Sequence, residues 1–230
     1  MRRLCGVFAL LLFSVIASLL AGAQAPSPPP ASSRPKVRAI TAFITIDRSN
    51  YKQKVDDAVA MLKRAKTTFE KEGYEVETVR ITTQPFPEYV HGLDRAKALA
   101  FLKEYDGYIA EQPQKAGIAV DANIGPAMMR DGDDATMADL LAEALCNTKI
   151  VNASLIVAGD DGIHWKAVRA AAHVIKYASE HSPHSQATFN FAATAMLTRL
   201  DSIANAGAPS GMSTAAVASS FGSGSDSYSL

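Results

Sequence analysis

The stretch VRAITAFITI, residues 37–46, decides the fold class of this 230-residue chain. Apolar residues run through it almost without interruption, and several are β-branched, which favours extended backbone. Strands with this composition are buried on both faces and belong to parallel sheets, whereas a one-sided antiparallel strand alternates apolar and polar residues. The stretch therefore predicts a buried strand of a parallel sheet.

The residues after this strand predict a helix and then a second strand. Apolar side chains recur at helical spacing over 51–72, and Gly73 supplies a stop signal. Residues 75–82 predict a strand that ends in the breaker-rich loop TQPFPEYVHG. The same alternation continues along the chain, with helices expected at 94–105, from 136 and at 163–179, and strands within 117–126, 149–159 and 187–197. This order predicts an α/β fold: a mainly parallel five-stranded sheet with crossover helices.

The amino terminus has the order of features found in secretory signal peptides. Arg2 and Arg3 precede an apolar run that stops at small residues, with an A-x-A site before Gln24. The apolar run is shorter than the roughly 20 residues that a membrane span needs. We therefore expect a cleaved signal peptide at 1–23 and a periplasmic or secreted protein without a stable membrane span.

Two segments of biased composition flank the core. Residues 24–35 are rich in Pro, Ser and Ala, which predicts an extended linker. Residues 200–230 are rich in Ser, Gly and Ala, which predicts a disordered tail. The α/β domain is therefore expected to span 36–199.

Charge and cysteine content narrow the class of protein. Removal of Arg2 and Arg3 with the signal leaves 21 basic residues against 23 acidic ones, so the net charge is near −2 and nothing suggests binding to nucleic acid. Removal of Cys5 leaves Cys146 alone, so the mature chain can form no internal disulfide. Cys146 stands among apolar residues at helical spacing, which favours a buried, inert thiol over a nucleophile.

Polar residues that follow the predicted strands form the candidate site, because ligands of parallel α/β proteins bind at the carboxyl ends of the strands. Carboxylate and imidazole groups can carry out acid/base or metal-assisted chemistry. The candidate catalytic residues are Asp160, Asp161 and His164. The candidate ligand-binding residues are Asp47, Gln84 and Asn123, and Arg48 belongs to the same polar set.

Two sequence patterns that could form a functional site also have a purely structural explanation. Asp160 or Asp161 could instead cap the following helix by accepting from its free amide groups. In EHSPHSQ, residues 180–186, two histidines and a carboxylate could hold a transition metal. That stretch is better explained as a helix end, with His181 in the last turn and Ser182-Pro183 as the terminator. The sequence contains no glycine-rich phosphate loop and no G-x-S-x-G, so the cofactor and any metal stay unassigned.

Four long phrases of the sequence carry a resemblance to a known family. They are KVRAITAFITIDR, VETVRITTQPFPEY, DANIGPAMMRDGDD and NASLIVAGDDGIHWKAVRAAAHVIKYASEHSPHSQATFNFAATAML. Between about Lys36 and Leu197 the chain closely resembles the amino-terminal half of a prokaryotic family, domain of unknown function 711, also called uncharacterised protein family 0210. After Leu197 the Ser/Gly-rich tail stands in place of the second half.

The resemblance implies a shape more than an activity. Members of the family look like the glycyl-radical-enzyme barrel, in which two five-stranded parallel halves form a ten-stranded barrel ringed by helices. The five strands expected here would form one half of such a barrel. A radical mechanism is not implied, because this sequence has neither the cysteine beyond the fifth strand nor the Arg-Val-x-Gly context of those enzymes.

Two functions are therefore expected from the sequence. The first is an exported α/β protein that binds or processes a small polar molecule at the strand carboxyl ends. The alternative is a noncatalytic, truncated homologue that acts as a binding or self-associating module. Open edges of its sheet would then favour a homodimer.

Overall fold

The structure, a computed structural model, describes residues 34–195. The predicted signal peptide, nearly all of the linker and the 200–230 tail lie outside these residues. The strands are β1 (Val37–Ile44), β2 (Val76–Thr83), β3 (Asp121–Pro126), β4 (Val151–Ile156), β5 (Ala158–Gly159), β6 (Gly162–Ile163) and β7 (Phe191–Thr194). The helices are α2 (Tyr51–Lys71), α3 (Phe86–Val90), α4 (Arg95–Ala110), α5 (Gln112–Ala116), α6 (Thr136–Asn147), α7 (Trp165–His181) and the 3₁₀ segment η1 (Pro183–Asn190).

The five longer strands form one parallel sheet in the order β1-β2-β3-β4-β7. This confirms the predicted five-stranded α/β sheet with interleaved helices. Successive strands are neighbours, as expected when each crossover returns the chain to the next position in the sheet. β5 and β6 form a separate antiparallel hairpin that follows β4.

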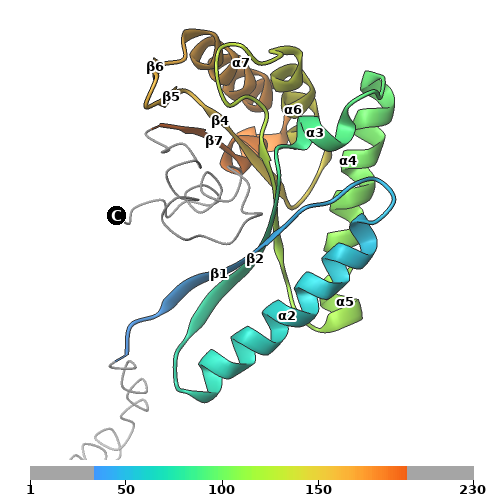
Figure 1. The fold of residues 1–230 in the computed structure, drawn as a ribbon, viewed down its shortest axis with the longest axis vertical. Helices are drawn as coiled ribbons and strands as arrows, with labels where there is room; N and C mark the ends of the chain where they lie inside the picture. The colour runs from blue at the N-terminus through green and yellow to red at the C-terminus, as the bar shows by residue number, and fades with distance from the viewer. Residues whose placement is uncertain (1–33, 196–230) are drawn as a thin grey trace, which may run out of the picture. The chain divides into compact units, whose positions relative to one another are not determined.

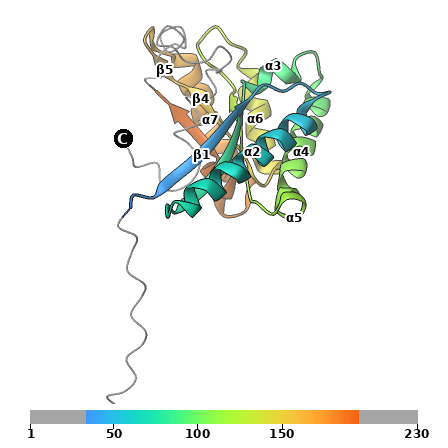
Figure 2. The same cartoon turned by 60° about the horizontal axis from the view of Figure 1, so that its bottom comes forward.

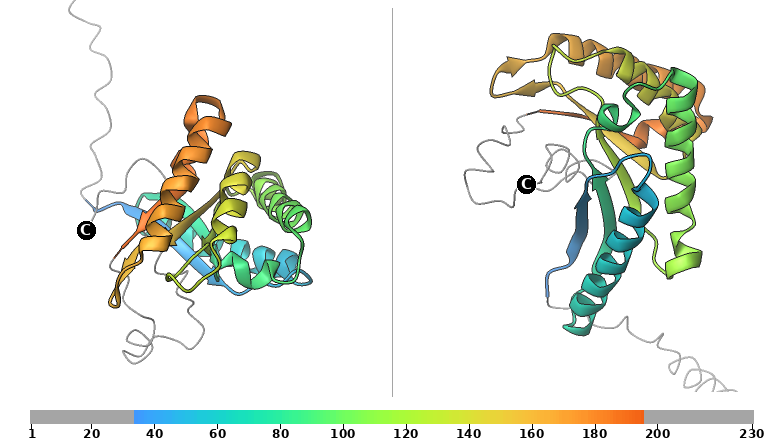
Figure 3. Two further views of the ribbon diagram at one scale, coloured as in Figure 1. Left: turned by 90° about the horizontal axis from the view of Figure 1, so that it is seen from above. Right: turned by 45° about the vertical axis from the view of Figure 1, so that its right-hand side comes forward.

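The helices lie along one face of the sheet. α2 packs on β1 and β2, and α4, α6 and α7 follow along the same face (Figures 1 and 2). Figure 3 shows these four helices in succession on one side of the strands. The side chains between the two layers are apolar and almost fully buried, among them Leu62, Ile81, Leu102, Ile124, Leu141 and Leu155. Removal of this apolar surface from water is the main stabilising contribution.

Successive side chains of a strand point to opposite faces of the sheet, and the face away from the helices carries polar side chains. On β2, Val79 and Ile81 face the helices, so Arg80 and Thr82 face the opposite side. The pairing of Thr82 with Asn123 continues this polar row onto β3. The carboxyl ends of all five strands also lie at one edge, as parallel pairing requires.

Several boundaries differ from the sequence expectation. The helix expected at 94–105 continues to Ala110, because Asp106 and Ile109 are buried on its inner side. Asp106 accepts hydrogen bonds from the backbone N–H groups of residues 149, 150 and 151 and so fixes the start of β4. The strand expected within 149–159 ends at Ile156, where the chain turns into the β5–β6 hairpin.

Two regions have a secondary structure that differs from the one predicted from the sequence. The loop TQPFPEYVHG contains α3, because a proline fits in the first turn of a helix, where no backbone donor is needed. The strand expected within 187–197 is only β7, and residues 187–190 belong to η1. His184 and Ser185 adopt positive φ angles of 52° and 56° there, which bends the chain between α7 and β7. No helix in the described part of the chain is long and apolar enough to cross a membrane.

Candidate functional site

At the carboxyl ends of β1 and β2, Gln84 joins two loops. Its side-chain amide accepts from the backbone N–H of Ile46 at 3.1 Å and donates to the Ile46 carbonyl at 2.7 Å. Gln84 is buried, and both ends of its amide are used by these two bonds. The structure therefore gives this predicted ligand-binding residue a role in holding the rim together.

Asp47 closes the turn that leads into α2. Its Oδ1 accepts from the backbone N–H groups of Ser49 and Asn50 and from the Ser49 hydroxyl, while Oδ2 accepts from Asn50 Nδ2. The hydrogen bonds from Ser49, followed by the one from Asn50 and the charge of Arg48, hold the pKa of Asp47 below its usual range. Asp47 is thus an exposed, ionised carboxylate at neutral pH. The Ser49 hydroxyl donates to this weak base and is not an activated nucleophile.

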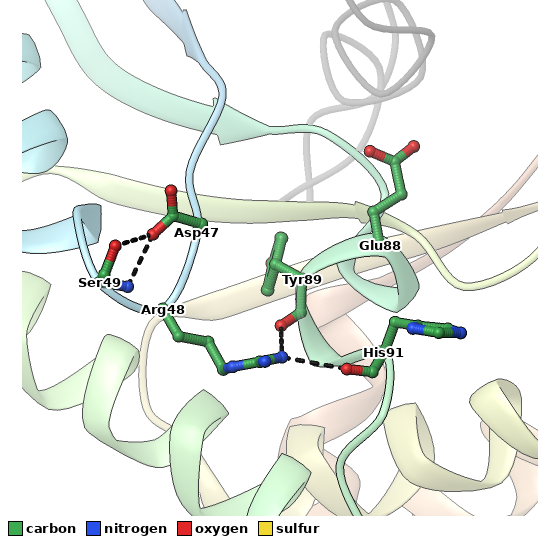
Figure 4. Close-up of a pocket in the computed structure, with 6 residues that line it drawn as sticks. All are labelled: Asp47, Arg48, Ser49, Glu88, Tyr89 and His91. Carbon is green, nitrogen blue, oxygen red and sulfur yellow. Dashed lines mark hydrogen bonds between the residues drawn. The ribbon is translucent and has the colours of Figure 1, made fainter.

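A surface depression of about 430 Å³ lies beside this turn (Figure 4). Arg48 is one of its lining residues, and one of its guanidinium nitrogens donates to the carbonyls of Tyr89 at 2.8 Å and His91 at 3.1 Å. The Glu88 carboxyl group and the His91 ring point away from Asp47 in Figure 4. Partial burial raises the pKa of Glu88. The described residues that line the depression are Asp47, Arg48, Ser49, Glu88, Tyr89 and His91.

Asn123 lies on the sheet face opposite the helices. Its Nδ2 donates to Asn152 Oδ1 at 2.6 Å, and its Oδ1 accepts from the backbone N–H of Gly125 at 2.8 Å. Gly125 has a φ of 73°, and the register between β3 and β4 shifts between Asn123 and Pro126. The side chain therefore spans the irregular end of β3.

Asp160 and Asp161 form the tip of the β5–β6 hairpin. Gly162, with a φ of 108°, allows the tight turn, and Asp160 is exposed. Gly159 lies so close to the turn that a Cβ there would be 3.0 Å from Asp161 Oδ1 and 3.7 Å from His164 Cε1. The hairpin thus folds Asp161 back over the residue that precedes α7.

His164 is the buried member of the predicted catalytic set. Its Nδ1 lies 3.0 Å from the carbonyl oxygen of Ile156, and its Nε2 lies 2.8 Å from Asp161 Oδ1. A carbonyl and an ionised carboxylate only accept hydrogen bonds, so a ring that makes both bonds carries two protons. Burial lowers the pKa of His164, but the bonds to Asp161 and Ile156 and the charges of Asp161 and Asp131 outweigh it, so the net shift is upward.

The cap of α7 comes from a different aspartate than expected. Asp131, in the loop between β3 and α6, accepts from the backbone N–H groups of Lys166 at 2.8 Å and Ala167 at 3.1 Å. The capping alternative had Asp160 or Asp161 accept from the free amides of this helix, and the structure gives the bonds to these two amides to Asp131. Asp161 lies instead against His164, and the α7 amino terminus is closed by a residue 35 positions away.

The predicted site residues fall into separate groups. Asp161 and His164 are in contact at the β5–β6 hairpin, whereas Gln84 holds Ile46, the residue that precedes Asp47, at the ends of β1 and β2. His181 lies in the last turn of α7, with Ser182 as the C-cap, which confirms the helix-end explanation of EHSPHSQ. Among the described residues, no group of three or more His, Cys, Asp and Glu side chains could hold a metal ion.

Some residues near these groups had no signal in the sequence. Asp131 stands far from α7 along the chain, and Asn152 lies inside a buried strand, where nothing in the sequence points to its bond with Asn123. Glu88 and His91 stand in the loop after β2 without a diagnostic spacing. Only the fold brings Glu88 and His91 to the wall of the depression.

A comparison with protein-family models places the chain in a family. The model of the uncharacterised family Uncharacterised ACR (DUF711) matches residues 31–224, which is most of the chain. The chain belongs to this family, as the sequence resemblance indicated. The match continues past Leu197, so the resemblance is longer than the 36–197 range expected from the sequence. No curated protein matches the chain.

Proposed function

We propose that this chain is an exported protein that binds a small polar molecule at the carboxyl-terminal edge of its parallel sheet. The observation that carries the proposal is the depression of about 430 Å³ beside Asp47 and Arg48, at the adjoining ends of β1 and β2. Its volume is in the range of small-molecule sites, and strand ends are where α/β proteins hold their ligands.

The charges around the depression favour a ligand with both a positive and a negative group. Arg48 uses one nitrogen for the carbonyls of Tyr89 and His91, which fixes the guanidinium and leaves its other N–H groups for an acceptor. Asp47 stays ionised, and its Oδ2 accepts only the bond from Asn50 among the described residues. A small zwitterion such as a free amino acid fits this pair of charges.

Any acid/base chemistry would use His164 and Asp161. In this proposal His164 holds a proton on each nitrogen, and the Asp161 side chain is largely exposed, so the pair could deliver a proton to a molecule bound at the hairpin. In this proposal Asp160, at the exposed tip, contributes negative charge.

Export and the barrel shape are part of the same proposal. The charged start, the apolar run and the A-x-A site support a signal peptide at 1–23. A parallel five-stranded sheet with its helices on one face supports the likeness to one half of a ten-stranded barrel. Both statements stay proposals about the mature protein.

A second candidate function is self-association as a noncatalytic module. It is favoured by the position of β1 and β7, which are the two edge strands of the parallel sheet. Within residues 34–195 no further strand pairs with their outer edges, so a second copy could pair there and complete a barrel as a homodimer.

Binding and mass measurements separate the two candidates. Calorimetry on the mature chain with a set of free amino acids should find one saturable ligand, and Arg48→Met should weaken its binding at least tenfold. Arg64→Met, at an exposed position of α2, is the matched control and should bind like the wild type. Light scattering on the same samples gives the mass. A dimer that binds none of the amino acids would overturn the first proposal and support the second.

A further inference from the structure

A second carboxyl group, that of Glu88, lines the depression beside Asp47 and Arg48. Glu88 comes from α3, whereas Asp47 comes from the turn after β1, and the two stand at opposite sides of the view in Figure 4. Among the described lining residues, Arg48 is the only one with a permanent positive charge. Carboxyl groups therefore outnumber that charge by two to one, which favours a ligand that carries more positive than negative charge.

The segment that carries Glu88 is held firmly in the fold. Phe86 and Tyr89, on either side of it in α3, are buried in the core. Arg48 joins the same segment to the turn after β1 through its bonds to the carbonyls of Tyr89 and His91. The backbone of Glu88 therefore has a fixed place relative to Arg48 and the rest of the depression.

The two carboxyl groups of the lining differ in their partners. Asp47 accepts hydrogen bonds from Ser49 and Asn50 in its own turn. Desolvation raises the pKa of Glu88, and no cation or hydrogen-bond donor of the described chain offsets this effect. The Glu88 side chain still reaches solvent, so a molecule in the depression can contact it. A cation of the ligand would supply the stabilisation that the protein itself does not give to this carboxylate.

The directions of these groups indicate how the charges of a ligand would be distributed. The Glu88 carboxyl group points away from Asp47, so a single ammonium group is poorly placed to contact both carboxylates. Two separate ammonium groups could contact one carboxylate each. Arg48 keeps N–H groups for a carboxylate of the ligand. These three charges match an α-amino acid whose side chain ends in an ammonium group.

We propose that the depression selects amino acids with a cationic side chain, such as ornithine and lysine, and that Glu88 is the residue that sets this preference. The inference rests on the proposed function, because it assigns a side-chain charge to the amino acid bound there. Ion pairs that remain open to solvent contribute modestly, so we expect a preference of about threefold to fivefold over a neutral amino acid of the same shape.

Ornithine and norleucine are a matched pair of probes, because norleucine has a methyl group where ornithine has its side-chain ammonium. Calorimetry on the full mature chain, at neutral pH and low ionic strength, measures both affinities. Lysine is the third probe and tests a side chain longer by one methylene. Ornithine or lysine should bind at least about threefold tighter than norleucine. This comparison decides the ligand class on the wild type, without any variant.

Glu88→Gln tests the assigned residue, because it keeps the size of the side chain and removes its charge. The affinities of this variant for ornithine, lysine and norleucine should differ by less than about twofold. Its affinity for norleucine should equal that of the wild type, which also shows that the depression has kept its structure. Glu180→Gln, at an exposed position near the end of α7, is the matched control and should keep the full preference.

The inference and the proposed function fail in different ways. Norleucine binding as tight as that of ornithine and lysine would overturn the inference and leave the amino-acid site in place. A Glu88→Gln variant that keeps the full preference would do the same. Absence of saturable binding by every free amino acid would overturn both.

Discussion

His164 Nε2 lies 2.8 Å from Asp161 Oδ1, so a buried imidazole is joined to an exposed carboxylate across the turn of the β5–β6 hairpin. The other ring nitrogen of His164 bonds the carbonyl of Ile156 at the end of β4. The ring thereby fastens the hairpin to the sheet. This one contact connects the stability of the hairpin with the protonation of the proposed acid.

A rise in pH should weaken this attachment. The pKa of His164 is raised in the folded protein, so its stabilisation is complete below the ordinary value of about 6.5 and is lost as the pH rises through the folded value. We expect the difference in unfolding free energy between the wild type and His164→Gln, measured in urea at pH 6 to 9, to shrink with increasing pH. A difference that stays constant or grows would contradict the assigned protonation state.

Replacement of Gly159 by alanine should disturb the same contact. The new Cβ would lie 3.0 Å from Asp161 Oδ1, so the carboxylate must shift by a few tenths of an ångström, and we expect this shift to weaken its contact with His164. The pKa of His164, followed by the NMR shifts of its ring protons, should then be lower than in the wild type. Gly107→Ala is the control, because a Cβ there meets nothing within 4 Å. A His164 pKa that is unchanged in Gly159→Ala would sink this expectation.

Loss of the distant cap should destabilise α7. Asp131 accepts from two backbone N–H groups in the first turn of that helix, so Asp131→Ala should lower the unfolding free energy by about 1 kcal/mol. Asp160→Ala, at the exposed hairpin tip, should change it by less than about 0.5 kcal/mol. Urea unfolding of both variants makes the comparison. The opposite order would restore Asp160 as a structural residue.

The largest single effect is expected at Asp106. Its carboxylate accepts from three successive backbone N–H groups at the start of β4, and Asp106→Ala would remove this acceptor from all three, including the buried N–H of Val151. We expect a loss of about 3 kcal/mol or more in unfolding free energy. Asp106→Asn keeps one acceptor oxygen and should lose less. Equal losses for the two variants would contradict this account, because the oxygen that asparagine keeps would then contribute nothing as an acceptor.

The periodic parts of the fold could be predicted from the sequence, and its short parts could not. Long apolar runs such as 37–46 and helical spacing such as that over 51–72 identify β1 and α2 because many residues repeat one signal. β5 and β6 have two residues each, which is too short to show any period. In α3, prolines that usually break a pattern occupy the first turn and so conceal the helix.

The candidate site was predictable only where its members are close in sequence. The Asp161–His164 contact joins residues three positions apart, and Asp47 bonds its own turn. Gln84 bonds a residue 38 positions away, so its structural role follows from the strand register alone. Among the described residues, Arg80 Nε and Ser154 Oγ are buried without a hydrogen-bond partner, which only the fold reveals, because it shows which strand face turns away from the helices.

The most direct test of the proposed function is an NMR titration of the ¹⁵N-labelled mature chain with the amino acid that binds most tightly. The account predicts that the backbone shifts that change upon saturation are concentrated at residues 47–49 and 88–91, around the depression. Changes confined to the edge strands β1 and β7, or no saturable change at all, would contradict ligand binding at this rim.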